Sequence, residues 1–347
     1  MLGSIALAET AYLHAHTANL ALTVRDPGNV EWQRNLSVSW ERLGNVRDAQ
    51  GDLTGALQAY TESKNIAEQL AATDPGNEQW QFNLGISNER IGDVLKAQRR
   101  LTQAAQVYQR RHEIIAKLAA ADPGNTLWQR DLSVSWNKLG DVRNAQGDLQ
   151  GALQAHTEGK NIANKLAIAG PGNALWQRDL FVSWIKLGDV RDAQCNQQDA
   201  LQAYTKAKNI ADNLASADPG NALRQRGLSH CWQKLGNLRR TQGDLEGALA
   251  AFTNSKNIAD RLVASDPDNA QWQRDLIILP LKLAEIAAAN TKRQDAVLHY
   301  AEALHVAREL VASGRLAPAD AWMVEDLQRR LATAKAAAAT PEPPPIL

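Results

Sequence analysis

The histidines are the side chains in this sequence that could act as general bases or metal ligands. Seven occur, and they are spread along the chain: His14, His16, His112, His156, His230, His299 and His305. A catalytic set needs a nucleophile, a base and a stabilising group that converge on one pocket. The histidines occupy unrelated positions of the internal repeat described below, and His14 and His16 face different directions on a helix. We therefore interpret all of them as structural.

Nucleophile and cofactor motifs give the same result. Cys195 and Cys231 are too few for a disulfide framework and suit a reducing compartment. The sequence contains no H-E-x-x-H, G-x-S-x-G, phosphate-binding loop or Cys-x-x-Cys pair. We predict that the chain is not an enzyme, that it uses no cofactor and no metal, and that it is cytoplasmic.

Composition excludes two further classes of partner. The chain has 38 basic and 38 acidic residues, so no net field attracts it to nucleic acid or anionic lipid. An RNA-reading repeat would also need a basic groove with base-stacking aromatics. The apolar N-terminus has no basic residue before Arg25 and contains Glu9, which argues against a signal peptide. We predict a folded protein with no nucleic-acid partner and no membrane partner.

A strict internal repeat organises the chain. The phrase Asp-Pro-Gly-Asn, or a close variant, recurs every 48 residues, starting at Asp26, Asp74, Asp122, Gly170, Asp218 and Asp266. Between two phrases, apolar residues at steps of three or four predict two amphipathic helices. We name them helix A, which carries Trp32, Leu36 and Trp40, and helix B, which carries Ala56 and Tyr60. Proline and glycine should end helix B, and the asparagine should cap the next helix A.

The repeat determines the predicted fold. One amphipathic pair cannot bury its apolar stripe alone, whereas stacked pairs share a continuous core. We predict an all-α, right-handed α-solenoid of stacked antiparallel helix pairs, forming a single domain over residues 1–338. Its expected parts are a half-repeat at 1–25, six repeats, a C-terminal capping helix at 318–338 and a disordered tail at 339–347. The repeats are expected at 26–73, 74–121, 122–169, 170–217, 218–265 and 266–313.

The residues of one unit resemble a known family. Trp40, Leu43 and Gly44, then Gln50-Gly51-Asp52, Ala56 and Tyr60, look like the tetratricopeptide repeat signature. That family has about 34 residues per repeat, so each helix here should gain about one heptad. We expect helices of about 18 to 20 residues, roughly 27 to 30 Å long.

Three further expectations concern packing. The ten tryptophans fall into two phases of the repeat, apart from Trp322, and we interpret them as core residues. Pro280 stands where other repeats have tryptophan and should kink or split its helix. The last helix, with Trp322, Leu327 and Leu331, should cover the open end of the stack.

The resemblance also implies a binding face. In related repeats helix A lines a concave surface, and contacts come shortly after the signature tryptophan. The twelve residues implied here as contacts are all acidic or amide residues: Glu41, Asn45, Asp48, Glu89, Asp93, Asn137, Asp141, Asn144, Asp189, Asp192, Gln233 and Asn237. Family members that hold a terminal carboxylate use lysines and arginine there, so we expect no such clamp in this chain. An acidic row suits a basic or amide-rich peptide.

A structural interpretation of the acidic row stays open. A basic column, Arg42, Arg90, Lys138, Lys186, Lys234 and Lys282, could pair with those carboxylates between repeats. The function implied by the resemblance is a protein-protein interaction scaffold that binds a peptide or protein partner on the concave helix-A face, as the C-terminal arm of a larger signalling protein. The alternative is a self-assembly module, a homo-oligomer that stacks end to end through the half-repeat at residues 8–25.

Overall fold

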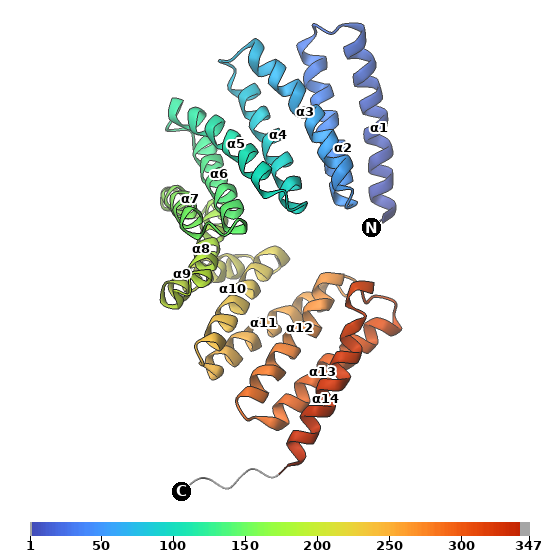
Figure 1. Cartoon of the computed structure of the whole chain (residues 1–347), viewed down its shortest axis with the longest axis vertical. Helices are drawn as coiled ribbons and strands as arrows, with labels where there is room; N and C mark the ends of the chain where they lie inside the picture. The colour runs from blue at the N-terminus through green and yellow to red at the C-terminus, as the bar shows by residue number, and fades with distance from the viewer. Residues whose placement is uncertain (1, 341–347) are drawn as a thin grey trace. The chain divides into compact units, whose positions relative to one another are not determined.

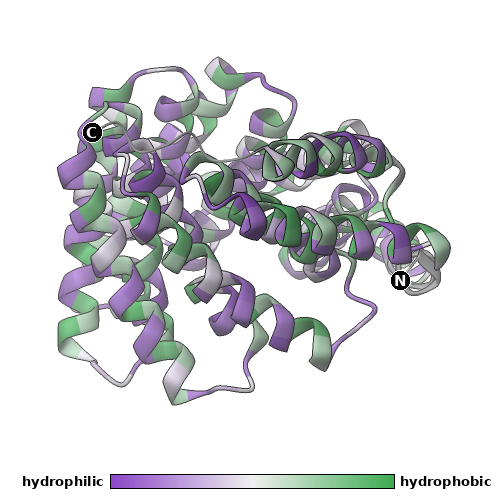
Figure 2. Cartoon of the chain, turned by 90° about the horizontal axis from the view of Figure 1, so that it is seen from below, coloured by the Kyte–Doolittle hydropathy of each residue, from purple (hydrophilic) through white to green (hydrophobic). Residues whose placement is uncertain are grey.

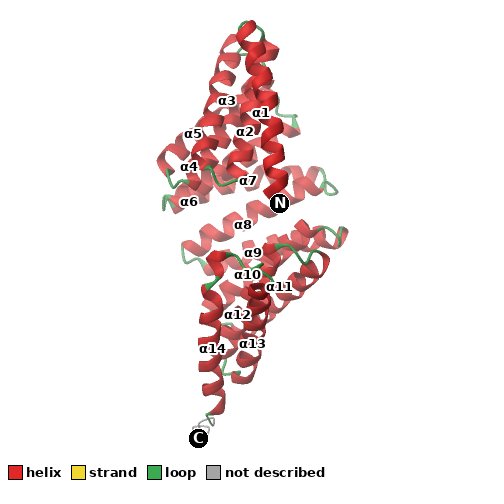
Figure 3. Cartoon of the chain, turned by 90° about the vertical axis from the view of Figure 1, so that its right-hand side faces the viewer, coloured by secondary structure: helices red, strands yellow, loops and turns green. Residues whose placement is uncertain are grey.

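The computed structural model describes residues 2–340. Of the tail predicted at 339–347, residues 341–347 lie outside them, and Ala339 is the last residue of a helix. Within this described part the chain forms fourteen α-helices, one short 3-10 helix and no strand (Figures 1 and 3). The α-helices are α1 (Leu2–Arg25), α2 (Val30–Ala49), α3 (Leu53–Thr73), α4 (Glu78–Ala97), α5 (Leu101–Ala121), α6 (Thr126–Ala145), α7 (Leu149–Ala169), α8 (Ala174–Ala193), α9 (Gln197–Ala217), α10 (Ala222–Thr241), α11 (Leu245–Ser265), α12 (Ala270–Ala289), α13 (Arg293–Ala312) and α14 (Trp322–Ala339).

Each repeat folds into one helix A and one helix B. Helices A, such as α2 and α4, have 20 residues, and helices B, such as α3 and α5, have 21, which confirms the expected extra heptads. The turn phrase supplies the caps: the Asn29 side chain accepts a hydrogen bond from the Trp32 backbone N–H at 3.1 Å. Asp52 caps the following helix B by accepting from the Gly55 N–H at 2.9 Å.

The two helices of a repeat approach closely where the signature glycine meets an aromatic ring. A Cβ on Gly44 would lie 2.5 Å from the Tyr60 ring, and the same holds for Gly92 and Tyr108. Tyr60 and Tyr108 are buried. The glycine is therefore required by contact with helix B, since any side chain there would overlap the ring.

The chain divides into two compact units, one ending at Asp179 and the other beginning at Leu180, so that the boundary lies within α8. In the first unit each helix from α1 to α7 packs on the next along the chain, and in the second the same holds from α9 to α14. Hydrophobic and hydrophilic residues alternate along these helices (Figure 2), as an amphipathic stack requires. The all-α solenoid of paired helices is confirmed within each unit.

The tryptophans border the core and do not fill it: Trp136, Trp184, Trp232 and Trp272 are partly buried and pack against its buried residues. Nine of the ten are only half-buried, and Trp322 is 59% exposed. The fully buried aromatic rings belong to helix B instead, at Tyr108, Tyr204 and Phe252. The expectation failed because the tryptophan side chains flank the buried stripe of helix A, where a large ring covers apolar surface without leaving solvent.

Two expectations near the C-terminus change as well. Pro280, which we expected to kink or split its helix, does not split it: α12 is continuous through this residue, which is buried. Its neighbours Ile277 and Leu279 are fully buried, so packing offsets the lost backbone hydrogen bond. In α14, Leu327 packs into the core as expected, whereas Met323 takes the buried place that we assigned to Trp322. None of the described helices has the length and apolarity to cross a bilayer.

Candidate partner-binding face

The twelve sequence-predicted contact residues lie on helices α2, α4, α6, α8 and α10, beside the buried stripe of each helix A. Four of them are exposed: Asn45, Asp48, Asp192 and Asn237. The others are half-buried: Glu41, Glu89, Asp93, Asn137, Asp141, Asn144, Asp189 and Gln233. We call the polar surface that they form within each unit the helix-A face. Its role in partner binding stays a prediction.

Buried tyrosines of helix B hold part of this row in place. The Tyr108 hydroxyl donates to Asp93 Oδ1 at 2.5 Å, and the Tyr204 hydroxyl donates to Asp189 Oδ1 at 2.7 Å. Burial, followed by the neighbouring carboxylate, raises the pKa of both phenols far above the usual value. Tyr60 donates to Asn45 Oδ1 at 2.8 Å, and burial raises its pKa to about 12. The hydroxyl groups of all three tyrosines therefore stay protonated at neutral pH and can donate these hydrogen bonds.

Lysines from the next repeat neutralise the acidic row. In the first unit Lys138 Nζ lies 2.6 Å from Asp93 Oδ1 and 3.5 Å from Glu89 Oε1. In the second unit Lys234 Nζ lies 2.7 Å from Asp189 Oδ1. Lys138 and Lys234 of the basic column therefore pair with carboxylates one repeat away, and these two aspartates do not form an unpaired negative strip. Such partly exposed pairs contribute only about 0–1 kcal/mol each to the free energy of unfolding. They therefore affect how neighbouring repeats align more than how stable the fold is.

One arginine of helix B is buried among carboxylates. Arg111, on α5, is 1% exposed; its Nε lies 2.5 Å from Glu89 Oε2 and its Nη2 lies 3.6 Å from Asp131 Oδ1. Burial raises the pKa of Asp131, and the charges of Arg111 and Arg130 partly oppose this rise. Arg111 was not among the predicted contact residues. Its signal was a departure from the repeat, because the other repeats have a small residue at the position of Arg111: Ser63, Gly159, Ala207 and Ser255.

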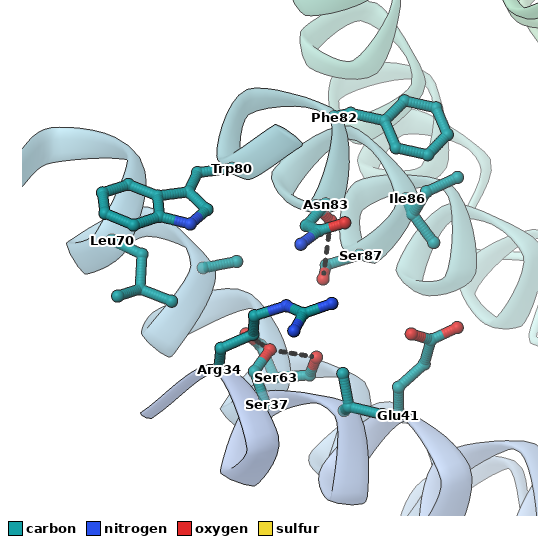
Figure 4. A pocket seen from close by; sticks show the side chains of 12 residues that line it. Arg34, Ser37, Glu41, Ser63, Leu70, Trp80, Phe82, Asn83, Ile86 and Ser87 are labelled. Carbon is teal, nitrogen blue, oxygen red and sulfur yellow. Dashed lines mark hydrogen bonds between the residues drawn. The ribbon is translucent and has the colours of Figure 1, made fainter. Parts of the chain in front are cut away.

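A groove opens between α2, α3 and α4 in the first unit. Its cavity has a volume of about 230 Å³ and is lined by side chains of all three helices (Figure 4). Arg34, Ser37 and Glu41 come from α2, Ser63 from α3, and Asn83 and Ile86 from α4. The groove thus combines one of the predicted contact residues, Glu41, with apolar walls.

Two histidines share one position of the repeat, contrary to our expectation. His16 and His112 both lie on a helix B, two repeats apart, and each ring packs on a tryptophan of the following helix A with centroids 4.1 Å apart. The His112 Nδ1 atom is 2.9 Å from Ser135 Oγ. Burial lowers the pKa of both histidines, so the neutral imidazole is favoured. Their role in the stack is structural.

Lysine replaces histidine at this position in other repeats. Lys208 Nζ lies 5.0 Å from the centre of the Trp232 ring, in a cation–π arrangement. Cys231, beside that tryptophan, is buried, and burial raises its pKa to about 12, so it is an unreactive thiol. No group of histidine, cysteine, aspartate or glutamate within residues 2–340 is arranged to hold a metal ion.

Comparison with known proteins shows the fold and no closer relationship. The sequence matches no protein-family model and no curated protein. The structure of BtubC (BKLC) from P. vanneervenii aligns over 74% of this chain and 92% of its own length, with a TM-score of 0.58 and 16% identity. The structure of the apo form of RapI aligns over 87% and 98%, with a TM-score of 0.52 and 13% identity. Together with the signature residues and the stacked pairs, these likenesses show a tetratricopeptide-like fold.

Proposed function

We propose that this tetratricopeptide-like solenoid is a scaffold that binds a protein or peptide partner on the helix-A face of its N-terminal unit. The groove between α2, α3 and α4 is the observation that carries the proposal. It offers polar groups from Glu41 and Asn83 beside apolar walls from Ile86, within a cavity of about 230 Å³. Sites that bind side chains combine apolar walls with a few convergent polar groups in this way.

The charges around the groove could align a partner along the surface. On α4 and α6, carboxylates and ammonium groups alternate at fixed positions, as in the pair formed by Asp93 and Lys138. Partners that present the complementary order of charges are oriented by such a surface, and partners with the wrong order are disfavoured. The affinity should come mainly from the groove, where side chains leave water.

A matched pair of variants tests this proposal. Ile86→Arg places a long charged side chain in the groove, whereas Gln58→Arg adds the same side chain to the exposed surface of helix B on α3. Proteins captured from a lysate by the intact chain should be lost with Ile86→Arg and kept with Gln58→Arg, after circular dichroism shows equal helicity. Capture that survives Ile86→Arg would contradict a helix-A binding site in this unit.

One observation favours self-assembly as a second candidate. Leu13, Leu20 and Val24 lie on one face of α1 and are exposed, Val24 at 72%. Apolar residues seven and four apart form a stripe of the kind that a neighbouring helix covers. If a second copy of the chain covers it, sedimentation velocity should show size increasing with concentration, and Leu20→Lys should abolish the increase. A monomer at all concentrations would exclude this candidate.

A further inference from the structure

We infer that the groove between α2, α3 and α4 binds the side chain of an arginine supplied by the partner. This inference rests on the proposed function and names the chemistry that the groove selects. In the next repeat the protein's own Arg111, on α5, occupies the equivalent place between Glu89 of α4 and Asp131 of α6.

The two places correspond residue by residue through the 48-residue period. Glu41 corresponds to Glu89, and Asn83 corresponds to Asp131. Ser63, which lines the groove, corresponds to Arg111. The arrangement around Arg111 therefore shows one group that this framework accepts, which is a guanidinium between two side-chain oxygen acceptors.

The charges of the two places differ at four positions: Ser63 corresponds to Arg111, Asn83 to Asp131, Arg34 to Phe82 and Phe82 to Arg130. Glu89 lies within 4 Å of two cations, Lys138 at 3.5 Å and Arg111 at 2.5 Å. Its counterpart Glu41 is 3.7 Å from Arg90, the equivalent of Lys138. Within residues 2–340, Arg90 is the one cation that forms an ion pair with Glu41. The place of the second cation is open to a ligand.

Size and shape suit one long side chain. A cavity of about 230 Å³ is smaller than the ~300–1,000 Å³ of pockets that take drug-sized ligands. Ala67 and Leu70 of α3 and Val38 of α2 line it and can cover the methylene stem of an arginine. Asn83 Oδ1 accepts from Gln79 at 2.9 Å and retains a second lone pair. A planar guanidinium can bridge separated acceptors, which a point-like ammonium cannot.

Arg34 lines the same groove and distinguishes a cationic ligand from an anionic one. Its guanidinium reaches into the groove between Ser63 and Ser87 (Figure 4). Arg34 is exposed, and it forms no hydrogen bond or ion pair within the described part of the chain. An arginine side chain from the partner would have to displace the Arg34 side chain from the groove. For an anionic guest, Arg34 would be the main ligand.

The test uses the full chain and a simple probe, Nα-acetyl-arginine methylamide, with the isosteric but uncharged citrulline derivative as control. Binding is followed by the indole N–H resonance of Trp80, which lines the groove and can be assigned with Trp80→Phe. We expect the arginine probe to bind at least tenfold more tightly than the citrulline probe. Arg34→Ala should strengthen the binding severalfold. Equal binding of both probes would overturn the inference, as would loss of binding in Arg34→Ala.

Two double variants, which exchange residues between equivalent positions of the two repeats, provide a second test. Ser63→Arg with Asn83→Asp recreates the arrangement around Arg111 and should abolish probe binding, whereas Gln58→Arg should leave it unchanged. The reverse exchange, Arg111→Ser with Asp131→Asn, should open a second groove and raise the number of bound probes from one to two. If the first double variant does not fold, the reverse exchange decides, and a stoichiometry that stays at one contradicts the inference.

The two proposals fail in different ways. A partner that is lost with Ile86→Arg but kept with Ser63→Arg and Asn83→Asp would leave the scaffold standing and overturn the arginine guest. Probe binding with the expected pattern, but no partner lost with Ile86→Arg, would retain the chemistry of the groove and overturn the scaffold function of this face.

Discussion

Replacing Arg111 by serine should destabilise the N-terminal unit strongly, even though serine occupies the same position in two other repeats. Arg111 is buried, and its loss leaves Glu89 and Asp131 without their shared cation. Breaking a buried pair in this way typically costs about 3–5 kcal/mol. Here Lys138 stays 3.5 Å from Glu89, which should reduce the loss. We expect a decrease of about 2–4 kcal/mol in the free energy of unfolding.

Urea denaturation at pH 7, followed by circular dichroism, measures this loss in the transition that reports the N-terminal unit. The double variant Arg111→Ser, Glu89→Gln should recover part of it, because the neutral amide no longer leaves an unpaired buried charge. The loss should also shrink as the pH falls towards 4. Burial raises the pKa of Asp131 and the charge of Arg111 lowers it, so the pKa rises further in the variant. The native state of the variant therefore takes up a proton before its unfolded state does, and it gains more stability at low pH than the wild type. A loss below about 0.5 kcal/mol, or one that does not depend on pH, would refute this reasoning.

Three further predictions concern the repeat framework. Cys195 has φ 59° where Gly51 has φ 82°, so Cys195→Gly should raise the free energy of unfolding by about 1 kcal/mol, and a thermal midpoint that does not rise would contradict the strain. Burial lowers the pKa of His112, so the unfolded state binds more protons and the stability falls as the pH drops below about 6.5. In His112→Lys, which copies Lys208, the difference in urea midpoint between pH 7 and pH 5 should become smaller. An unchanged difference would show that other groups cause the pH dependence. Gly44→Ala would press a methyl group against the buried Tyr60 ring and should cost about 1–3 kcal/mol by thermal denaturation, whereas a neutral result would show that the ring can move aside.

The helices and their bounds could be predicted because their signals are local. Each turn phrase ends one helix and caps the next, and Asn29 and Asp52 act within three residues of their own positions. The extra heptads followed from the 48-residue spacing together with the resemblance to a family of about 34 residues per repeat. Periodicity could not tell a residue at the centre of the buried stripe from one on its edge, which is why the tryptophans were placed too deep.

The candidate site was harder to predict, because its contacts join residues about one repeat apart. Whether Lys138 pairs with Asp93 depends on how one helix A sits beside the next, and the sequence left this pairing as one of two alternatives. Arg111 and the shared phase of His16 and His112 are different, since their signals lie in the alignment of the repeats themselves. Departures from an otherwise strict period therefore mark residues with special contacts, and the Arg111 network is the clearest of them.

Photo-crosslinking tests the central claim, partner binding on the helix-A face, most directly. Benzoylphenylalanine would be introduced at Asp48, an exposed predicted contact on α2, and in a matched variant at Gln58, exposed on helix B. The account predicts adducts with a foreign protein from Asp48 and none from Gln58. Adducts from Gln58 alone would contradict it by placing the partner on the opposite helices, and adducts only with a second copy of the chain would replace the scaffold with self-assembly.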